Sequence, residues 1–171
     1  MAACAFRPYV KTRLLVDAGI IGYTTCMLNY IFFDHTADIG VEIFGRTKKD
    51  LFAHAAHALF DIMIQTAGHK SRKSQVAKGR QIIKKVDGAD VEDLFINFLR
   101  ELLYLFNGTR WVVDHCEMIE CRNTRLVATL WVEPYNKKKH SMKTEIKAVT
   151  YSGLSVKKFK SGWIAKVIFD V

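Results

Sequence analysis

Two acidic segments far apart in the chain carry the residue types that could bind a metal ion. Residues 34–40 read Asp-His-Thr-Ala-Asp-Ile-Gly, and the chain ends in Phe-Asp-Val. Strand ends and chain termini can direct several oxygen atoms at one cation, and hard cations such as Ca²⁺ and Mg²⁺ prefer oxygen ligands. If the two segments meet, Asp38, Asp170 and the terminal carboxylate of Val171 would share one ion. On the residues alone, a solvated acidic turn and an ordinary tail remain the simpler interpretation.

The elements that would position these residues follow from hydrophobic periodicity. An apolar run predicts a strand over 28–33, residues 34–37 form a turn, and alternation from Asp38 to Phe44 predicts a half-buried strand. Thr47 and Asp50 resemble a capping box, which predicts a helix from there to about Thr66.

A second helix is expected over residues 91 to about 107. Asp90 is placed to cap it, Asp93 favours the helix dipole, and Gly108 fits the position after its end. Further strands are expected over 81–86, 111–120, 124–133, 144–151 and 163–171. This order has no βαβ rhythm, so we expect an α+β fold with two main helices packed on one face of a largely antiparallel sheet.

Composition and charge limit the function classes. The chain has 171 residues, half of them hydrophobic, which favours one domain with a sizeable core. Its formal charge of +9 favours an anionic partner, although a solvated basic surface explains it equally well. A basic RNA-binding module is therefore an alternative function. Against it, aromatic residues are not interleaved with basic runs such as Lys137–Lys139 as a stacking platform would require.

Several other classes find little support. The chain contains no P-loop, GxSxG, HExxH or GxGxxG motif, and its acidic residues are too few in any one place for a two-metal phosphohydrolase. Its four cysteines form no CxxC pair, which favours reduced thiols in the cytoplasm. No apolar run is long enough for a membrane span, so we expect no membrane partner.

Residues 1–26 are expected to be an N-terminal extension, followed by one domain over residues 27–171. The extension is basic and partly apolar. A start codon assigned too far upstream is the preferred interpretation, and a targeting peptide is the alternative.

Four stretches, in order along the chain, resemble the archease family. They are residues 33–40 (FDHTADIG), 93–104 (DLFINFLRELLY), 144–151 (TEIKAVTY) and the end, 169–171 (FDV). The resemblance covers about residues 27–171. It implies an archease-like fold, a strand-helix-strand-strand module with added strands.

The resemblance implies an accessory protein rather than an enzyme. Archeases assist the RtcB-type RNA ligase, which joins tRNA halves in tRNA splicing and can act in RNA repair. They promote guanylylation of the ligase and multiple turnover, so RNA would be an indirect partner.

The family's divalent-cation site maps onto Asp38, Asp170 and Val171, and the ion is expected to be calcium, with magnesium or manganese as alternatives. Asp34, His35, Glu145 and Lys147 are candidates for supporting the site or contacting the partner. By strand spacing, Glu145 and Lys147 would share a face and could equally form a surface ion pair. Many family members carry histidine where this chain has Ser152, so no imidazole is expected to act there.

Overall fold

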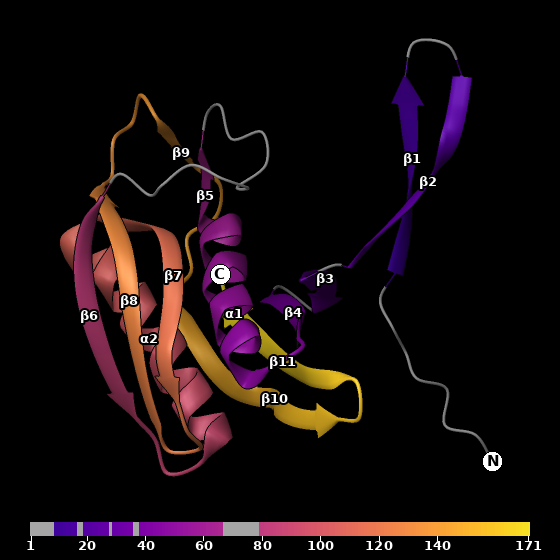
Figure 1. Ribbon diagram of the computed structural model, residues 1–171. Coiled ribbons are helices and arrows are strands. Elements are labelled where there is room, and N and C mark those ends of the chain that lie inside the picture. The colour runs from indigo at the N-terminus through magenta and orange to yellow at the C-terminus, as the bar shows by residue number, and fades with distance from the viewer. Residues whose placement is uncertain (1–8, 17–18, 28, 36–37, 67–78) are drawn as a thin grey trace.

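The computed structural model describes residues 9–16, 19–27, 29–35, 38–66 and 79–171 (Figure 1). Strands β1 (Tyr9–Val16) and β2 (Gly19–Met27) pair antiparallel as a separate two-stranded sheet. The predicted boundary between residues 26 and 27 stays a prediction. Positions 36–37 of the predicted turn lie outside the described residues.

The first main sheet has four antiparallel strands in the order β10-β11-β4-β3. Their bounds are β3 (Tyr30–His35), β4 (Asp38–Gly45), β10 (Ala148–Phe159) and β11 (Gly162–Asp170). Alternation sorts the side chains of β4, because Val41 and Ile43 are fully buried in the core while Glu42 between them faces the other way.

The second main sheet has three strands, in the order β6-β8-β7. They are β6 (Arg80–Asp87), β7 (Trp111–Cys121) and β8 (Arg125–Pro134). A small sheet joins β5 (Ile64–Thr66) to β9 (His140–Met142). Pairing of neighbouring strands is antiparallel throughout the described residues.

Two helices, α1 (Lys48–Met63) and α2 (Val91–Thr109), lie between the two main sheets. Helix α1 contacts β4 and β7, and α2 contacts β10 and β6, so each helix bridges the sheets (Figure 1). The core is centred on Phe52, whose ring centroid lies 5.2 Å from that of Phe95 and 5.7 Å from that of Phe98. None of the helices among the described residues is long and apolar enough to cross a membrane.

The α+β class is confirmed, with the helices on one face of each main sheet rather than of a single sheet. Both helix starts are confirmed as well. Thr47 and Asp50 form a reciprocal capping box at α1, and the Asp90 carboxylate accepts hydrogen bonds from the backbone N–H groups at the start of α2. These caps depend on local hydrogen bonds, which a short sequence motif specifies.

Four boundaries differ from the prediction. Strand β3 continues through Asp34 and His35, which were expected in the turn, because both residues pair with β4. Helix α1 ends at Met63, because Ile64 is extended and begins a strand that pairs with β9. Helix α2 runs past Gly108, and Arg110 adopts the left-handed conformation (φ 55°) that ends it. The predicted strand over 144–151 begins only at Ala148, since the preceding residues connect β9 to β10 without strand pairing.

Candidate functional site

The register of the first main sheet brings the chain terminus beside the acidic segment. Phe169 of β11 pairs with Ile39 of β4. Continuing this antiparallel register by one residue places Asp170 opposite Asp38. Residues at matched positions on neighbouring strands point to the same face. Since Phe169 is buried in the core, Asp38 and Asp170 project to the face away from the helices, and both are half-buried.

Lys147 binds the terminal residue. Its backbone N–H donates to the carbonyl oxygen of Asp170 at 2.8 Å, and its ammonium group donates to an oxygen of Val171, also at 2.8 Å. The connector before β10 therefore fixes the end of the chain at the edge of the Asp38–Asp170 pair. One positive charge partly balances the carboxylates gathered there.

The backbones of Asp34 and His35 lie on the other side of Asp38. His35 is the cross-strand partner of Asp38, and Asp34 pairs with Ile39. Asp38 thus stands between His35 in β3 and Asp170 in β11 at one end of the sheet. The side chains of Asp34 and His35 lie outside the described residues, so their supporting role stays a prediction.

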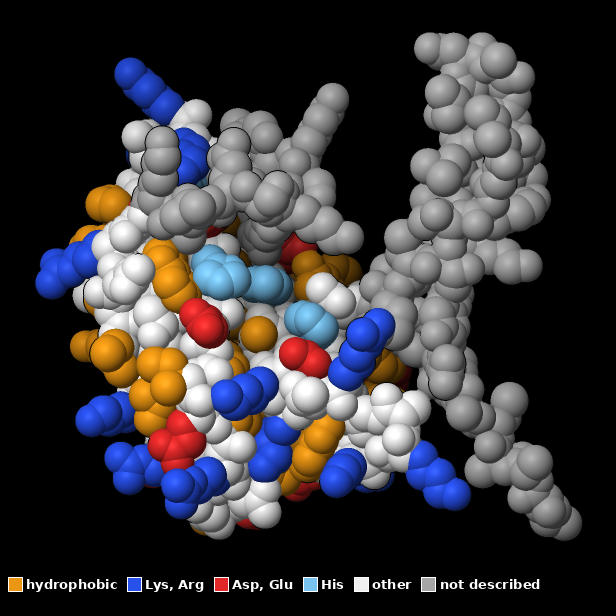
Figure 2. All heavy atoms as spheres, viewed as in Figure 1, with side chains coloured by type: hydrophobic (Ala, Val, Ile, Leu, Met, Phe, Trp, Pro, Cys, Tyr) orange, Lys and Arg blue, Asp and Glu red, His pale blue; other side chains and the backbone are white. Residues whose placement is uncertain are grey.

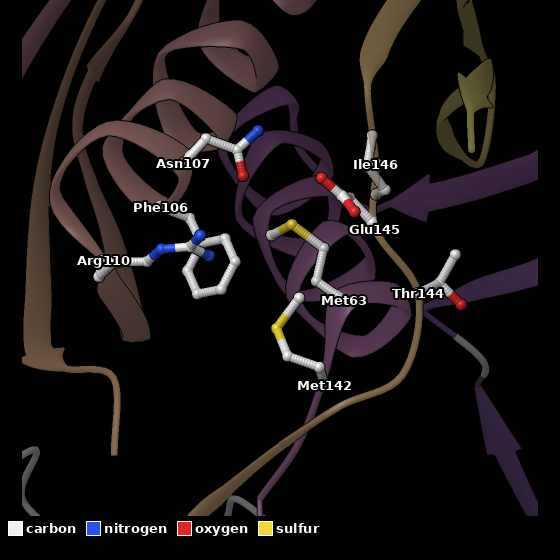
Figure 3. Close-up of a pocket in the computed structure, with 8 residues that line it drawn as sticks. All are labelled: Met63, Phe106, Asn107, Arg110, Met142, Thr144, Glu145 and Ile146. Carbon is white, nitrogen blue, oxygen red and sulfur yellow. The ribbon is translucent and has the colours of Figure 1, made fainter. Parts of the chain in front are cut away.

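Glu145 and Lys147 lie on the connector between β9 and β10 and not in a strand, so the spacing argument for a shared strand face does not apply. Both are exposed on either side of the buried Ile146, and an ion pair between them stays a prediction. Glu145 lines a separate cavity of about 230 Å³ at the C-terminal ends of both helices (Figure 3). The other lining residues are Met63, Phe106, Asn107, Arg110, Met142, Thr144 and Ile146.

The donor set at the Asp38–Asp170 pair suits a hard cation. Two carboxylates and a terminal carboxylate supply only oxygen atoms, as Ca²⁺ and Mg²⁺ require. Across the described residues, no three His, Cys, Asp or Glu side chains come together as a metal-binding group. The predicted third ligand, Val171, is a main-chain group and not one of these side chains.

One polar cluster was missed by sequence reasoning. The Tyr151 hydroxyl donates to the Asp93 carboxylate, and the Arg100 guanidinium lies 4.9 Å from the Tyr151 ring centroid. The hydrogen bond from Tyr151, followed by that from the Ala89 N–H, lowers the pKa of Asp93. The same contact raises the pKa of Tyr151. Both residues stand in the motif stretches, but only the tertiary structure shows that they meet.

This cluster holds an irregular part of β10 against the start of α2. The register of β10 against β11 shifts between Thr150 and Ser155. Gly153 within the shift has φ +65°, and a Cβ there would lie 3.0 Å from Cδ1 of Ile168. Ser152 lies exposed in this segment.

Comparison with known proteins identifies the family. The sequence profile of the Archease protein family matches residues 30–171. Protein archease of Methanosarcina barkeri is 35% identical over 146 residues, which cover 83% of this chain and 95% of that relative. Protein archease of Pyrococcus furiosus is 31% identical over 149 residues, covering 85% and 100% of the two chains.

Solved structures agree. The solution structure of a Methanobacterium thermoautotrophicum protein superposes with a TM-score of 0.61 and 25% identity over 84% of this chain and 99% of that one. The crystal structure of an archease from Thermotoga maritima, described as a possible chaperone, has a TM-score of 0.54 and 24% identity over 81% and 94%. The fold is thus that of a small α+β protein with helices between antiparallel sheets. The chain belongs to the archease family.

Proposed function

We propose that this protein is a metal-binding accessory factor that activates an RtcB-type RNA ligase in the cytoplasm, in tRNA splicing or RNA repair. It would promote guanylylation of the ligase and multiple turnover without itself being an enzyme. Family membership supports the class of partner. The observation that carries the proposal is the register that aligns Asp170 with Asp38 beside the chain terminus.

Electrostatics supports a bound cation at this position. Two carboxylates and the terminal carboxylate would carry about three negative charges, which repel one another unless a cation lies among them. Lys147 supplies one positive charge at Val171. A divalent cation between Asp38 and Asp170 would stabilise the two carboxylates further, and calcium suits flexible, all-oxygen coordination, with magnesium or manganese as alternatives.

The cation has two roles open to it. It would tie the β3–β4 turn to the end of β11, which gives a rigid acidic tip, or it would bridge that tip to the ligase. Either role predicts that Asp38 and Asp170 are needed for activation and not for folding, because both are half-buried residues at the end of a sheet.

A guanylylation assay with a cognate RtcB-type ligase tests the proposal. The ligase would be incubated with GTP and manganese, with or without this protein and with or without prior chelator treatment. We expect wild-type protein to accelerate formation of the ligase–guanylate. We expect Asp38→Ala and Asp170→Ala each to reduce the rate to near that of the ligase alone, while circular dichroism stays unchanged.

Asp87→Ala is the matched control. Its side chain is 76% exposed, at the end of β6, and lies 4.0 Å from Arg125. This variant should stimulate like wild type. Full stimulation of the ligase by both the Asp38 and Asp170 variants would reject the proposed role.

A further inference from the structure

The end of the molecule opposite the Asp38–Asp170 pair gathers basic side chains from three elements. β11 runs from Gly162 to Asp170, so its two ends are roughly 25 Å apart at about 3.3 Å per residue. The β10–β11 hairpin, the start of α1 and the β7–β8 turn meet at the far end, because Lys48 lies over the Trp163 ring and donates to Asn123. We call this surface the basic end. Its residues are Arg46, Lys48, Lys49, Arg122, Lys157, Lys158 and Lys160.

The charge at the basic end is largely unbalanced. Asp50 is occupied by the capping box of α1, and Glu120 pairs with Arg122. Within the part of the chain that the structure describes, Lys157, Lys158 and Lys160 have no acidic side chain at ion-pairing distance, and all three are exposed. Figure 2 shows Lys and Arg side chains spread over the lower part of the molecule, where α1 begins.

An exposed aromatic ring stands among these lysines. Phe159 pairs with Gly162 at the tip of the hairpin, between Lys158 and Lys160, and 49% of its surface is exposed. The sequence itself reads Lys-Lys-Phe-Lys over residues 157–160, so the expectation that no aromatic residue is interleaved with a basic run does not hold at this hairpin tip. The structure adds that the Phe159 ring is exposed there.

We propose that the basic end binds single-stranded nucleic acid. A base would stack on the ring of Phe159 while the ammonium groups of Lys157, Lys158 and Lys160 contact phosphates, the combination by which single strands are held without sequence preference. An acidic protein surface could pair with the lysine ammonium groups, but such pairing would not involve the exposed ring of Phe159. An anionic membrane would need a broad apolar face, whereas Phe159 is the one exposed large apolar residue of this hairpin tip.

This surface is independent of the acidic pair. Because the two lie at opposite ends of β11, nucleic acid at the basic end leaves Asp38 and Asp170 accessible to a protein partner. The inference rests on the protein alone, so it can be tested without any ligase. Its failure would leave the guanylylation experiment unaffected, and the reverse also holds.

The test is fluorescence anisotropy of a labelled 12-nucleotide oligouridine, titrated with the full chain at several salt concentrations. We expect Phe159→Ala to weaken binding by about fivefold to a hundredfold, the range typical for loss of one stacked base, without changing the salt dependence. We expect the double variant Lys157→Gln/Lys158→Gln to weaken binding and to reduce the log–log salt slope by about 1.4, or about 0.7 per lost phosphate contact.

Two matched controls come from elsewhere on the surface. Lys137→Gln/Lys138→Gln removes the same charge from exposed positions of the β8–β9 connector, at the other end of the fold (Figure 1). Tyr104→Ala removes an aromatic side chain that is 68% exposed on α2. Both controls should bind the RNA like wild type.

Three outcomes would overturn the inference. The first is equal weakening by the Lys137/Lys138 and Lys157/Lys158 pairs, which would mean nonspecific attraction by net charge. The second is unchanged affinity in Phe159→Ala, which would mean a polyanion surface without stacking, as for an acidic protein. The third is binding to vesicles containing phosphatidylserine, dependent on Phe159, with no binding to the RNA. A parallel titration with a DNA oligonucleotide would show whether the 2′-hydroxyl contributes.

Discussion

At the scale of single residues, the acidic end depends on a balance of charge. Asp38 and Asp170 lie opposite each other at the ends of neighbouring strands, and the ammonium group of Lys147 lies 2.8 Å from an oxygen of Val171. The sequence motifs indicated the two aspartates and the terminus. The partner of Lys147 could not be predicted, because it depends on a connector that leaves the strand pattern at residues 143–147.

Lys147 and a bound cation would compete for the same negative charge. Replacing Lys147 with Met removes one positive charge a few ångströms from the proposed site, an interaction worth about 1 kcal/mol for exposed groups. We therefore expect Lys147→Met to bind Ca²⁺ about fivefold more tightly, as measured by isothermal titration calorimetry at low salt. Weaker binding would show that Lys147 supports the site instead of opposing the cation.

Gly40 in the acidic segment has a packing role. A Cβ at this position would lie 2.1 Å from Cε2 of Phe33, because the Phe33 ring crosses the sheet directly over Gly40. We expect Gly40→Ala to displace the ring and lower the free energy of unfolding by about 1–3 kcal/mol, the usual cost of overpacking. Urea denaturation would measure it.

Gly108→Ala provides the opposite control. Its Cβ would meet Tyr104 at an ordinary 3.5 Å, within helix α2. Since Ala is favoured over Gly inside helices, this variant should gain up to about 1 kcal/mol. A Gly40→Ala protein as stable as wild type would mean that Phe33 does not pack as described.

At the scale of elements, most strands and both helix starts were predictable because their signals are local. Alternation located β4, and the strands expected over 81–86, 111–120, 124–133 and 163–171 correspond to β6, β7, β8 and β11. The capping residues Thr47 and Asp90 located the helix starts. The short β5–β9 pair was not predictable. Each strand has three residues, and Ile64 leaves the helical pattern only because Met142 lies opposite it in the folded chain.

The docking of β10 on α2 gives a pH dependence. The hydrogen bond from Tyr151 is the largest cause of the lowered pKa of Asp93, and Asp93 in turn raises the pKa of Tyr151. A lowered carboxyl pKa contributes stability above its ordinary value of 3.8, which is lost as the pH falls through the folded value. A raised phenol pKa contributes stability below 10.0, which is lost as the pH rises through the folded value.

Tyr151→Phe should therefore be less stable than wild type near pH 7, with a difference that shrinks as the pH falls below 3.8 and as it rises above 10.0. Thermal unfolding followed by circular dichroism across this range would measure the difference. Tyr104→Phe is the control, because Tyr104 is an exposed tyrosine on α2, the helix that carries Asp93, and this variant should be as stable as wild type across the pH range. A constant difference at every pH would contradict the role given to the hydroxyl group.

At the scale of the whole molecule, the sequence predicted the α+β class but not the layering. Hydrophobic periodicity shows which face of an element is buried, while strand order depends on contacts between distant segments. Nothing local in β10 and β11 indicates that they join β4 and β3, leaving β6, β8 and β7 to form a separate sheet across the helices. That same long-range pairing places the last residues of the chain beside Asp38.

Whether Asp38 and Asp170 share one ion can be measured by isothermal titration calorimetry with calcium, on the wild-type chain, Asp38→Asn, Asp170→Asn and the control Asp87→Asn. We expect one site per chain in the wild type and in Asp87→Asn. We expect at least about tenfold weaker binding, a loss of about 1.4 kcal/mol, when either Asp38 or Asp170 loses its charge. Wild-type affinity in both the Asp38 and Asp170 variants would contradict a shared site.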